Sequence, residues 1–208
     1  MGGKWNRKAK AHVFGDDPAE RLDEAILTMS YERPKDYGFF PTPPQTVELL
    51  MREAEIGKAD VCLEPSAGHG AIAEAMAKIV GQERVTTVEL LPENCEILRA
   101  KGFHPFQSNF LHWATDRRFD VIVMNPPFAK QEDLAHVLHA YTFLKPGGRL
   151  VSVMSCGMTF RMDRRAIAFR NLLNDRGGRW EDLPEEAFKA SGTMVRTVMV
   201  ILDKPRDD

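Results

Sequence analysis

The sequence predicts an α/β protein in which a mostly parallel sheet carries helices on both faces. From Phe39 onward, short apolar runs typical of strands alternate with segments whose apolar residues recur at helical spacing. The chain has 208 residues and a hydrophobic fraction of 43%, enough for one domain with a substantial core. Two of the predicted strands also end in unusual residues, and ligands bind at the carboxyl ends of strands in such sheets.

The order of elements follows from apolar spacing and from helix start signals. The segment Met1–Gly15 is polar and basic, so we expect a mobile tail, which fits either a solvated tail or a basic arm that contacts phosphates. Asp17-Pro18 is typical of a helix start, and this helix is predicted to run to about Met29. Further helices are predicted at 43–55, 71–80, 92–101, 131–144 and 164–175, with the Pro-Gly-Gly run at 146–148 ending the fourth. Strands are predicted at 59–63, 84–88, 102–107, 120–124, 149–154 and 193–202.

The most informative motif is Asn125-Pro126-Pro127-Phe128, which follows the apolar run at 119–124. Two prolines cannot continue a strand, so the strand stops in a rigid turn. The Asn125 side-chain oxygen and the Pro126 carbonyl can each accept a hydrogen bond from an exocyclic amino group, and Phe128 can stack on the ring that carries this group. The motif therefore suits a reaction in which a planar amino nitrogen attacks an electrophile.

A second candidate site follows the strand predicted at 59–63. The run from Glu64 to Gly70 contains small residues that permit a tight turn, and backbone N–H groups are available at the start of the next helix. Glu89 ends the next strand, 19 residues after Gly70, where a carboxylate can accept hydrogen bonds from ribose hydroxyls. The two strands together predict a site for an adenosine-type ligand.

The same turn also satisfies the relaxed dinucleotide pattern Gly-x-Gly-x-x-Ala over residues 68–73, so a nicotinamide-dependent oxidoreductase is an alternative. Two features oppose it. Glu64 places a carboxylate where a pyrophosphate would pass, which suits a cationic or amine-bearing cofactor better. Hydride transfer also has no need of the Asn-Pro-Pro-Phe turn.

Charge and cysteine content narrow the class of protein. The net charge of −2 gives no attraction of the whole molecule to polyanions. No apolar run reaches membrane-spanning length, so we expect no membrane partner. The three cysteines, Cys62, Cys95 and Cys156, fit neither a disulfide framework nor a zinc site, so we expect a cytoplasmic protein without a metal.

The two motifs together resemble those of class I S-adenosylmethionine-dependent amino-methyltransferases, most of all the bacterial and phage DNA adenine-N6 methyltransferases. Three more stretches extend the resemblance over about residues 37–203: Phe39-Phe40-Pro41-Thr42-Pro43, Asn109-Phe110-Leu111, and the strand at 193–202 behind Phe188 and Gly192. The resemblance implies S-adenosylmethionine as the cofactor. It also implies a doubly wound, Rossmann-like methyltransferase fold with a seven-stranded sheet and an antiparallel last strand.

The resemblance further implies a role for each matching residue. Asn125 and Pro126 would hold the substrate amino group, with Phe128 stacked on a flipped base. Glu64 would lie near the methionine amino group of the cofactor, and Asn109 stands where the family usually has Asp, a change that can weaken cofactor binding. The predicted catalytic residues are Asn125, Pro126, Pro127 and Phe128. The predicted cofactor-binding residues are Phe40, Thr42 (cofactor carboxylate), Glu64, Pro65, Ser66, Ala67, Gly68, Gly70, Glu89 (ribose), Leu90, Asn109 and Phe110 (adenine); no metal ligand is predicted.

The domain prediction is a tail with a short helix at 1–36 and a catalytic domain at 37–208. Typical DNA adenine methyltransferases carry a large target-recognition region, whereas only residues 156–191 separate the last two strands predicted here, so none is expected. An arginine cluster lies in this interval, and it fits either a phosphate-contacting ridge or a solvated helix face. Its members are Arg161, Arg164, Arg165, Arg170, Arg176 and Arg179.

The first functional hypothesis is methylation of adenine N6 in DNA, with the base flipped out or already unpaired. The alternatives are methylation of an RNA base or of a protein glutamine, and a catalytically silent nucleic-acid-binding subunit. The predicted partner is nucleic acid, DNA above all, with a partner subunit or a homodimer to supply target recognition.

Overall fold

The computed structural model describes residues 4–6, 11–13, 41–184 and 196–206. The chain divides into two compact units, Met1–Phe39 and Phe40–Asp208. In the first unit, β1 (Lys4–Asn6) pairs antiparallel with β2 (Ala11–Val13), a hairpin that the sequence did not predict. The helix predicted at 17–29 and the residues Phe40, Phe188 and Gly192 lie outside the described part of the chain.

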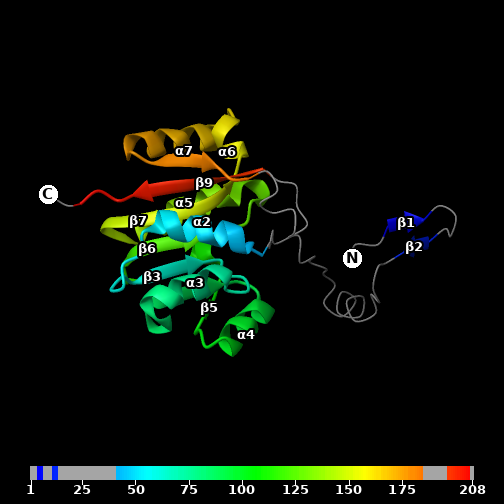
Figure 1. Ribbon diagram of the computed structural model, residues 1–208. Coiled ribbons are helices and arrows are strands. Elements are labelled where there is room, and N and C mark those ends of the chain that lie inside the picture. The colour runs from blue at the N-terminus through cyan, green and yellow to red at the C-terminus, as the bar shows by residue number, and fades with distance from the viewer. Residues whose placement is uncertain (1–3, 7–10, 14–40, 185–195, 207–208) are drawn as a thin grey trace. The chain divides into compact units, whose positions relative to one another are not determined.

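The second unit alternates strands and helices in the predicted order, as Figure 1 shows. Its helices are α2 (Pro44–Ala54), α3 (Ala71–Val80), α4 (Pro92–Ala100), α5 (Glu132–Thr142), α6 (Gly157–Phe160) and α7 (Arg164–Asp175). Its strands are β3 (Cys62–Pro65), β4 (Val85–Glu89), β5 (Phe106–Gln107), β6 (Phe119–Met124), β7 (Leu144–Ser155), β8 (Arg179–Asp182) and β9 (Thr197–Asp203). Short 3-10 turns lie at η2 (Gln82–Arg84), η3 (Phe110–His112) and η4 (Ala129–Gln131).

The seven strands form one mixed sheet in the order β5-β4-β3-β6-β7-β9-β8. The five strands β3 to β7 pair in parallel with one another, whereas β9 is antiparallel to both β7 and β8. The predicted fold class is confirmed, with seven strands and an antiparallel last strand. From β3 the sheet grows toward one edge through β4 and β5, and β6 then pairs with the opposite side of β3. The topological switch point therefore lies between β3 and β6. The two turns singled out in the sequence therefore follow neighbouring strand ends.

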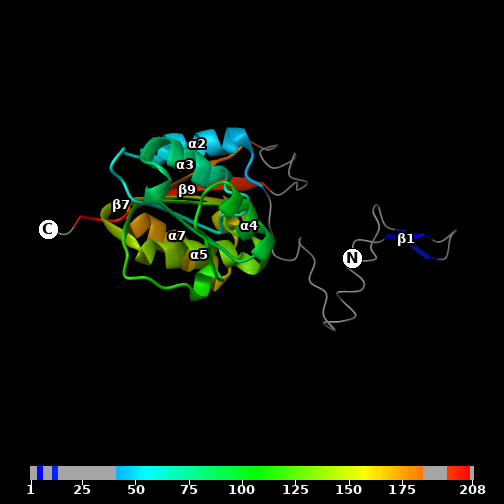
Figure 2. The ribbon, with the colours of Figure 1, turned by 90° about the horizontal axis from the view of Figure 1, so that it is seen from below.

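The core has one apolar layer on each face of the sheet. Along β6, Ile122 packs into the cluster with residues of α5 and α7, whereas Val121 and Val123 pack into the cluster with residues of α2 and α3. Figure 2 shows α2 and α3 on one side of the sheet and α5 and α7 on the other. Burial on both faces explains why the strands are continuous apolar runs in the sequence. Within the described residues, no helix combines the length and apolarity that crossing a membrane requires.

β3 begins three residues later than predicted. Ala59 and Asp60 belong to a turn, in which the Asp60 side chain accepts a hydrogen bond from the Gly57 N–H at 2.8 Å. Because the strand is shifted toward the ligand-binding edge, Glu64 and Pro65 are part of the strand itself.

β7 begins at Leu144 and contains the Pro-Gly-Gly run that was expected to end a helix. The Gly147 N–H donates to the carbonyl of Lys204 at 2.9 Å, and the Lys204 N–H donates to the Gly148 carbonyl at 2.8 Å. Pairing with the segment after β9 therefore holds this run in the sheet.

Other element ends also differ from their predicted positions. α5 begins at Glu132, because Gln131 has a left-handed φ of 62°. The strand predicted at 102–107 is reduced to β5, and β9 starts at Thr197, with residues 193–195 outside the described part. α6 and β8 were not predicted, because α6 is a single turn and all four residues of β8 are exposed.

Candidate active site

The turn after β3 is built from left-handed backbone at three positions. Ser66, Gly68 and Gly70 have φ values of 65°, 54° and 81°, a region that glycine adopts without steric cost. A Cβ on Gly70 would lie 2.6 Å from Cδ2 of the buried Leu98, so this position requires glycine for space as well. α3 begins directly after Gly70, and its first N–H groups lie beside the turn.

Glu89, at the end of β4, holds this turn in place. Its Oε2 accepts a hydrogen bond from the Gly68 N–H at 2.6 Å, and its Oε1 accepts one from the Leu91 N–H at 2.8 Å. The Asn94 side chain donates to Oε1 at 3.3 Å. The residue predicted to hold the ribose is therefore buried and fixes the backbone of the glycine turn after β3.

Glu64 is a buried carboxylate within the same strand end, and its side chain is only 2% exposed. Burial raises the pKa of Glu64 well above its ordinary value, and the nearby charges of Glu89 and Glu74 raise it further, against one hydrogen bond from the Ala73 N–H. Among the described residues, Glu64 Oε2 has no hydrogen-bond partner. A buried carboxyl group with an unpartnered oxygen fits a cationic group of a bound cofactor, beside which it would ionise.

The Asn-Pro-Pro-Phe turn follows β6 and is linked to the segment that precedes α2. The Asn125 Nδ2 group donates a hydrogen bond to Thr42 Oγ1 at 3.0 Å. Because the amide NH₂ points to Thr42, the amide oxygen is the side of Asn125 that can accept hydrogen bonds from a substrate amino group. The structure thus joins two residues that the sequence placed in separate motifs, 83 positions apart.

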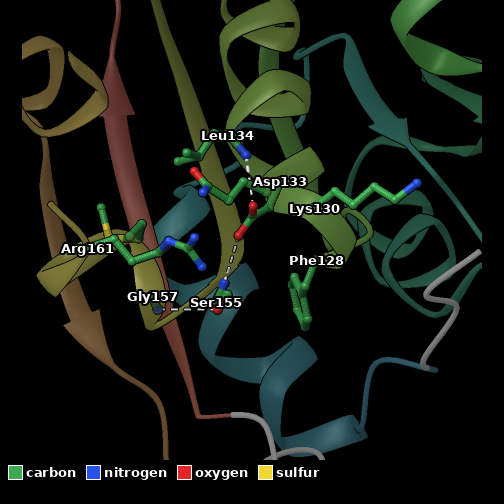
Figure 3. Close-up of a pocket in the computed structure, with 9 residues that line it drawn as sticks. Phe128, Lys130, Asp133, Leu134, Ser155, Gly157 and Arg161 are labelled. Carbon is green, nitrogen blue, oxygen red and sulfur yellow. Dashed lines mark hydrogen bonds between the residues drawn. The ribbon is translucent and has the colours of Figure 1, made fainter. Parts of the chain in front are cut away.

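A pocket of about 170 Å³ lies beyond the carboxyl ends of β6 and β7. Phe128 and Arg161 lie on opposite sides of it, and Lys130 extends away on the side opposite to Arg161 (Figure 3). The pocket is lined by Phe128, Lys130, Gln131, Asp133, Leu134, Ser155, Gly157, Met158 and Arg161.

Asp133 forms the inner wall of this pocket. Its two oxygens accept hydrogen bonds from the N–H groups of Leu134 and Ser155, each at 3.0 Å, which joins the start of α5 to the end of β7 (Figure 3). Burial raises the pKa of Asp133, and these backbone hydrogen bonds oppose the shift. The sequence analysis missed this residue, because an acid in the first turn of a helix is ordinarily a solvated, dipole-favoured side chain.

Asn109 and Phe110 lie at the end of β5, as the motif predicts. Asn109 Oδ1 accepts a hydrogen bond from the Leu111 N–H at 2.9 Å and so caps η3. Phe110 is only 3% exposed and its ring packs against His136 and His139, with centroid distances of 5.6 and 4.9 Å. Contact between Phe110 and the adenine of a cofactor stays a prediction.

Comparison with known proteins agrees with this architecture. Residues 45–169, more than half of the chain, match the family model of the methyltransferase small domain. The chain therefore belongs to the methyltransferase small-domain family, which falls among the class I S-adenosylmethionine-dependent methyltransferases. S-adenosylmethionine is the cofactor of this family, and the unsatisfied Glu64 carboxylate beside the glycine turn fits its cationic methionine end.

Two curated relatives are each 29% identical to the chain. Type II methyltransferase M.CvrRI of Paramecium bursaria Chlorella virus XZ-6E matches over 101 residues, 48% of this chain and 27% of the relative. Release factor glutamine methyltransferase of Koribacter versatilis (strain Ellin345) matches over 138 residues, 54% of this chain and 49% of the relative. The chain thus spans half or less of the length of these relatives.

Among solved structures, the type I restriction enzyme EcoKI M protein superimposes with a TM-score of 0.65 at 17% identity. The superposition covers 91% of this chain and 52% of that protein, and it reflects a shared fold. The family match favours the methyltransferase hypothesis over the nicotinamide-dependent oxidoreductase considered from the sequence.

Proposed function

We propose that the chain transfers a methyl group from S-adenosylmethionine to an exocyclic amino group, and that this group is N6 of adenine in DNA. The observation that carries the proposal is the Asn125 side chain, whose NH₂ is held by Thr42 at 3.0 Å, in the same turn as Phe128, which lines a pocket. This arrangement offers two oxygen acceptors and one aromatic face, which together match an amino group on a planar ring.

The residues of the turn would act on the nucleophile. By accepting hydrogen bonds from both N–H groups, Asn125 Oδ1 and the Pro126 carbonyl raise electron density on the amino nitrogen and favour the tetrahedral geometry of attack. Phe128 orients the ring by stacking. When bound, the cofactor supplies a methyl group on a positively charged sulfur, so the carbon–sulfur bond breaks as the new carbon–nitrogen bond forms. Alignment of the two reactants supplies much of the rate, and the methylated nitrogen loses one proton to solvent.

Two considerations favour a nucleic-acid base over a protein side chain. Phe128 gives an apolar face of the kind that stacks on a flipped base, whereas glutamine methyltransferases usually have Tyr at this position. M.CvrRI, a type II methyltransferase, is among the curated relatives. The matched relative from Koribacter versatilis keeps protein glutamine as the second candidate substrate.

Target recognition is proposed to depend on a partner subunit or on a second copy of the chain. Between β7 and β9, the described residues contain only α6, α7 and β8, with no room for a large recognition domain. The EcoKI M protein, which shares the fold, is by its name part of a type I restriction enzyme.

The test is methyl transfer from labelled S-adenosylmethionine to unmethylated DNA, total RNA and protein extract in parallel. We expect label in DNA adenine, and we expect Asn125→Ala to lower it by about 100-fold or more while cofactor binding is kept, because loss of a preorganised catalytic group has effects of this size. Asn174→Ala, an exposed asparagine on α7, is the matched control and should keep full activity.

Label that appears only in RNA or only in protein would overturn the DNA proposal and retain the methyl-transfer chemistry. Binding of the cofactor without label in any polymer would favour a silent subunit or a missing recognition partner. Addition of candidate partner subunits would then distinguish these two explanations.

A further inference from the structure

The segment from the last residue of α6 to the first turn of α7, residues 160–165, carries unusually exposed apolar side chains. Phe160 is 66% exposed and Met162 is 80% exposed, the two highest values among large hydrophobic residues in the described part of the chain. They flank Arg161, which lines the pocket opposite Phe128 (Figure 3). An aromatic ring and a thioether are thus held in solvent beside the proposed substrate pocket.

The same segment is basic. Arg164 and Arg165 are exposed in the first turn of α7, and neither has an ion-pair partner in the part of the chain that the structure describes. Cations at this end of a helix oppose the helix dipole, and the N-cap residue Asp163 supplies a negative charge beside them. Arg161 is paired with Asp163 at 2.9 Å, which leaves Arg164 and Arg165 as the charges available to a phosphate.

The segment is also fixed relative to the catalytic turn. The Gln131 side chain donates to Asp163 Oδ2 at 3.1 Å, and Asp163 Oδ1 accepts from the Ala166 N–H at 3.2 Å as the N-cap of α7. Lys130 and Gln131, two and three residues beyond Phe128, both have left-handed φ values, 51° and 62°. Strained backbone of this kind persists where the surroundings hold it, so the segment keeps a defined position beside the pocket.

We propose that residues 160–165 form the surface that holds the nucleic-acid strand around the target base. Phe160 and Met162 insert into the gap that the extruded base leaves in the stack, and Arg164 and Arg165 contact the flanking phosphates. Apolar wedges with neighbouring cations are a general means of stabilising an unstacked duplex. The inference rests on the proposed function and assigns to this segment the task of keeping the base extruded.

The experiment compares methyl transfer to duplex DNA with transfer to a single strand of the same sequence. For the double variant Phe160→Ala/Met162→Ala, we expect the rate on the duplex to fall by about tenfold or more and the rate on the single strand to stay within about threefold, because only the duplex has to be unstacked. For Arg164→Ala/Arg165→Ala, we expect a higher KM on both DNA forms. We also expect the slope of log binding constant against log salt concentration to shrink by about two units for the duplex.

Two matched controls test the specificity of these effects. Ile97→Ala/Leu138→Ala removes exposed apolar side chains from α4 and α5, and Lys78→Ala/Arg99→Ala removes exposed cations from α3 and α4. Both controls should match the wild type on duplex and single strand. Equal losses on the two DNA forms for Phe160→Ala/Met162→Ala, or no loss on the duplex, would overturn this inference and leave the proposed function standing. Absence of label in any DNA with the wild type would overturn both.

Discussion

Glu64 is a buried acid that carries a stability cost and for which we propose a role in cofactor binding. Without a cofactor, its raised pKa means that the folded state holds a proton that the unfolded chain releases. This difference makes the stability of the folded state depend on pH. The free energy of unfolding decreases as pH rises from the unfolded pKa of about 4.5 through the folded pKa, because the folded state must then ionise a buried group.

Glu64→Gln is therefore expected to have opposite effects on the empty and the cofactor-bound protein. In urea denaturation from about pH 5 to about pH 8, the variant without cofactor should gain stability over the wild type as pH rises. Calorimetric titration should show a Kd for S-adenosylmethionine that is about 10- to 100-fold higher in the variant, because a charge-assisted hydrogen bond is lost. Wild-type affinity should increase with pH, and variant affinity should not. A pH-independent wild-type affinity would contradict the role of Glu64 as the site of the cofactor cation.

Thr42 is expected to act as a positioning residue for Asn125. Thr42→Val keeps the shape of the side chain but removes the acceptor for the Asn125 NH₂ group, so the amide can rotate. At saturating cofactor, kcat should fall by about tenfold, whereas Thr42→Ser should stay within about threefold because it keeps the hydroxyl. An unchanged kcat with a raised KM for the cofactor alone would confine Thr42 to cofactor binding.

At the scale of the elements, the turn between β3 and α3 depends on one glycine and one core leucine. Gly70→Ala places a methyl group against Leu98 and also forces alanine into left-handed backbone, so we expect a loss of about 2–4 kcal/mol in the free energy of unfolding. Gly177→Ala is the matched control, because Gly177 has a similar φ of 66° and no atom within 4 Å of the added Cβ.

Gly177→Ala should show only the conformational cost, about 1–2 kcal/mol. The difference between the two variants measures the contact with Leu98. The double variant Gly70→Ala/Leu98→Ala should lose about 1 kcal/mol less in the free energy of unfolding than the two single variants lose together. The reason is that Leu98→Ala removes the side chain against which the methyl group added at position 70 clashes. Full additivity in urea denaturation would show that the clash relaxes elsewhere.

The elements also show which parts of the structure the sequence could reveal. α3 and α7 have the predicted bounds, because strong apolar periodicity and a clear start signal coincide. β8 lacks such a signal: none of its four residues is buried, and its pairing with β9 is a long-range contact that local sequence does not encode. The pocket residues Asp133 and Ser155 were missed for the same reason, since hydrogen bonding between distant segments creates their burial and alignment.

At the scale of the whole molecule, the order of strands in the sheet brings motifs that are distant in the sequence together. The glycine turn and the Asn-Pro-Pro-Phe turn are 55 positions apart when counted from Gly70 to Asn125, and they become neighbours only because β3 and β6 pair in parallel. The sequence predicted this because the two turns follow strands of a doubly wound sheet. It could not predict the Thr42–Asn125 hydrogen bond, which depends on the exact position of the chain before α2.

The two edges of the main sheet restrict how a second protein can associate with this chain. The edge strand β5 has two residues, and the edge strand β8 has four, three of which are charged. Short edge strands offer few free backbone groups for pairing with another strand, and the charges on β8 further discourage edge-to-edge aggregation. A subunit that supplies target recognition is therefore expected to bind through helices or loops, and continuation of the β-sheet from one chain into the next is disfavoured.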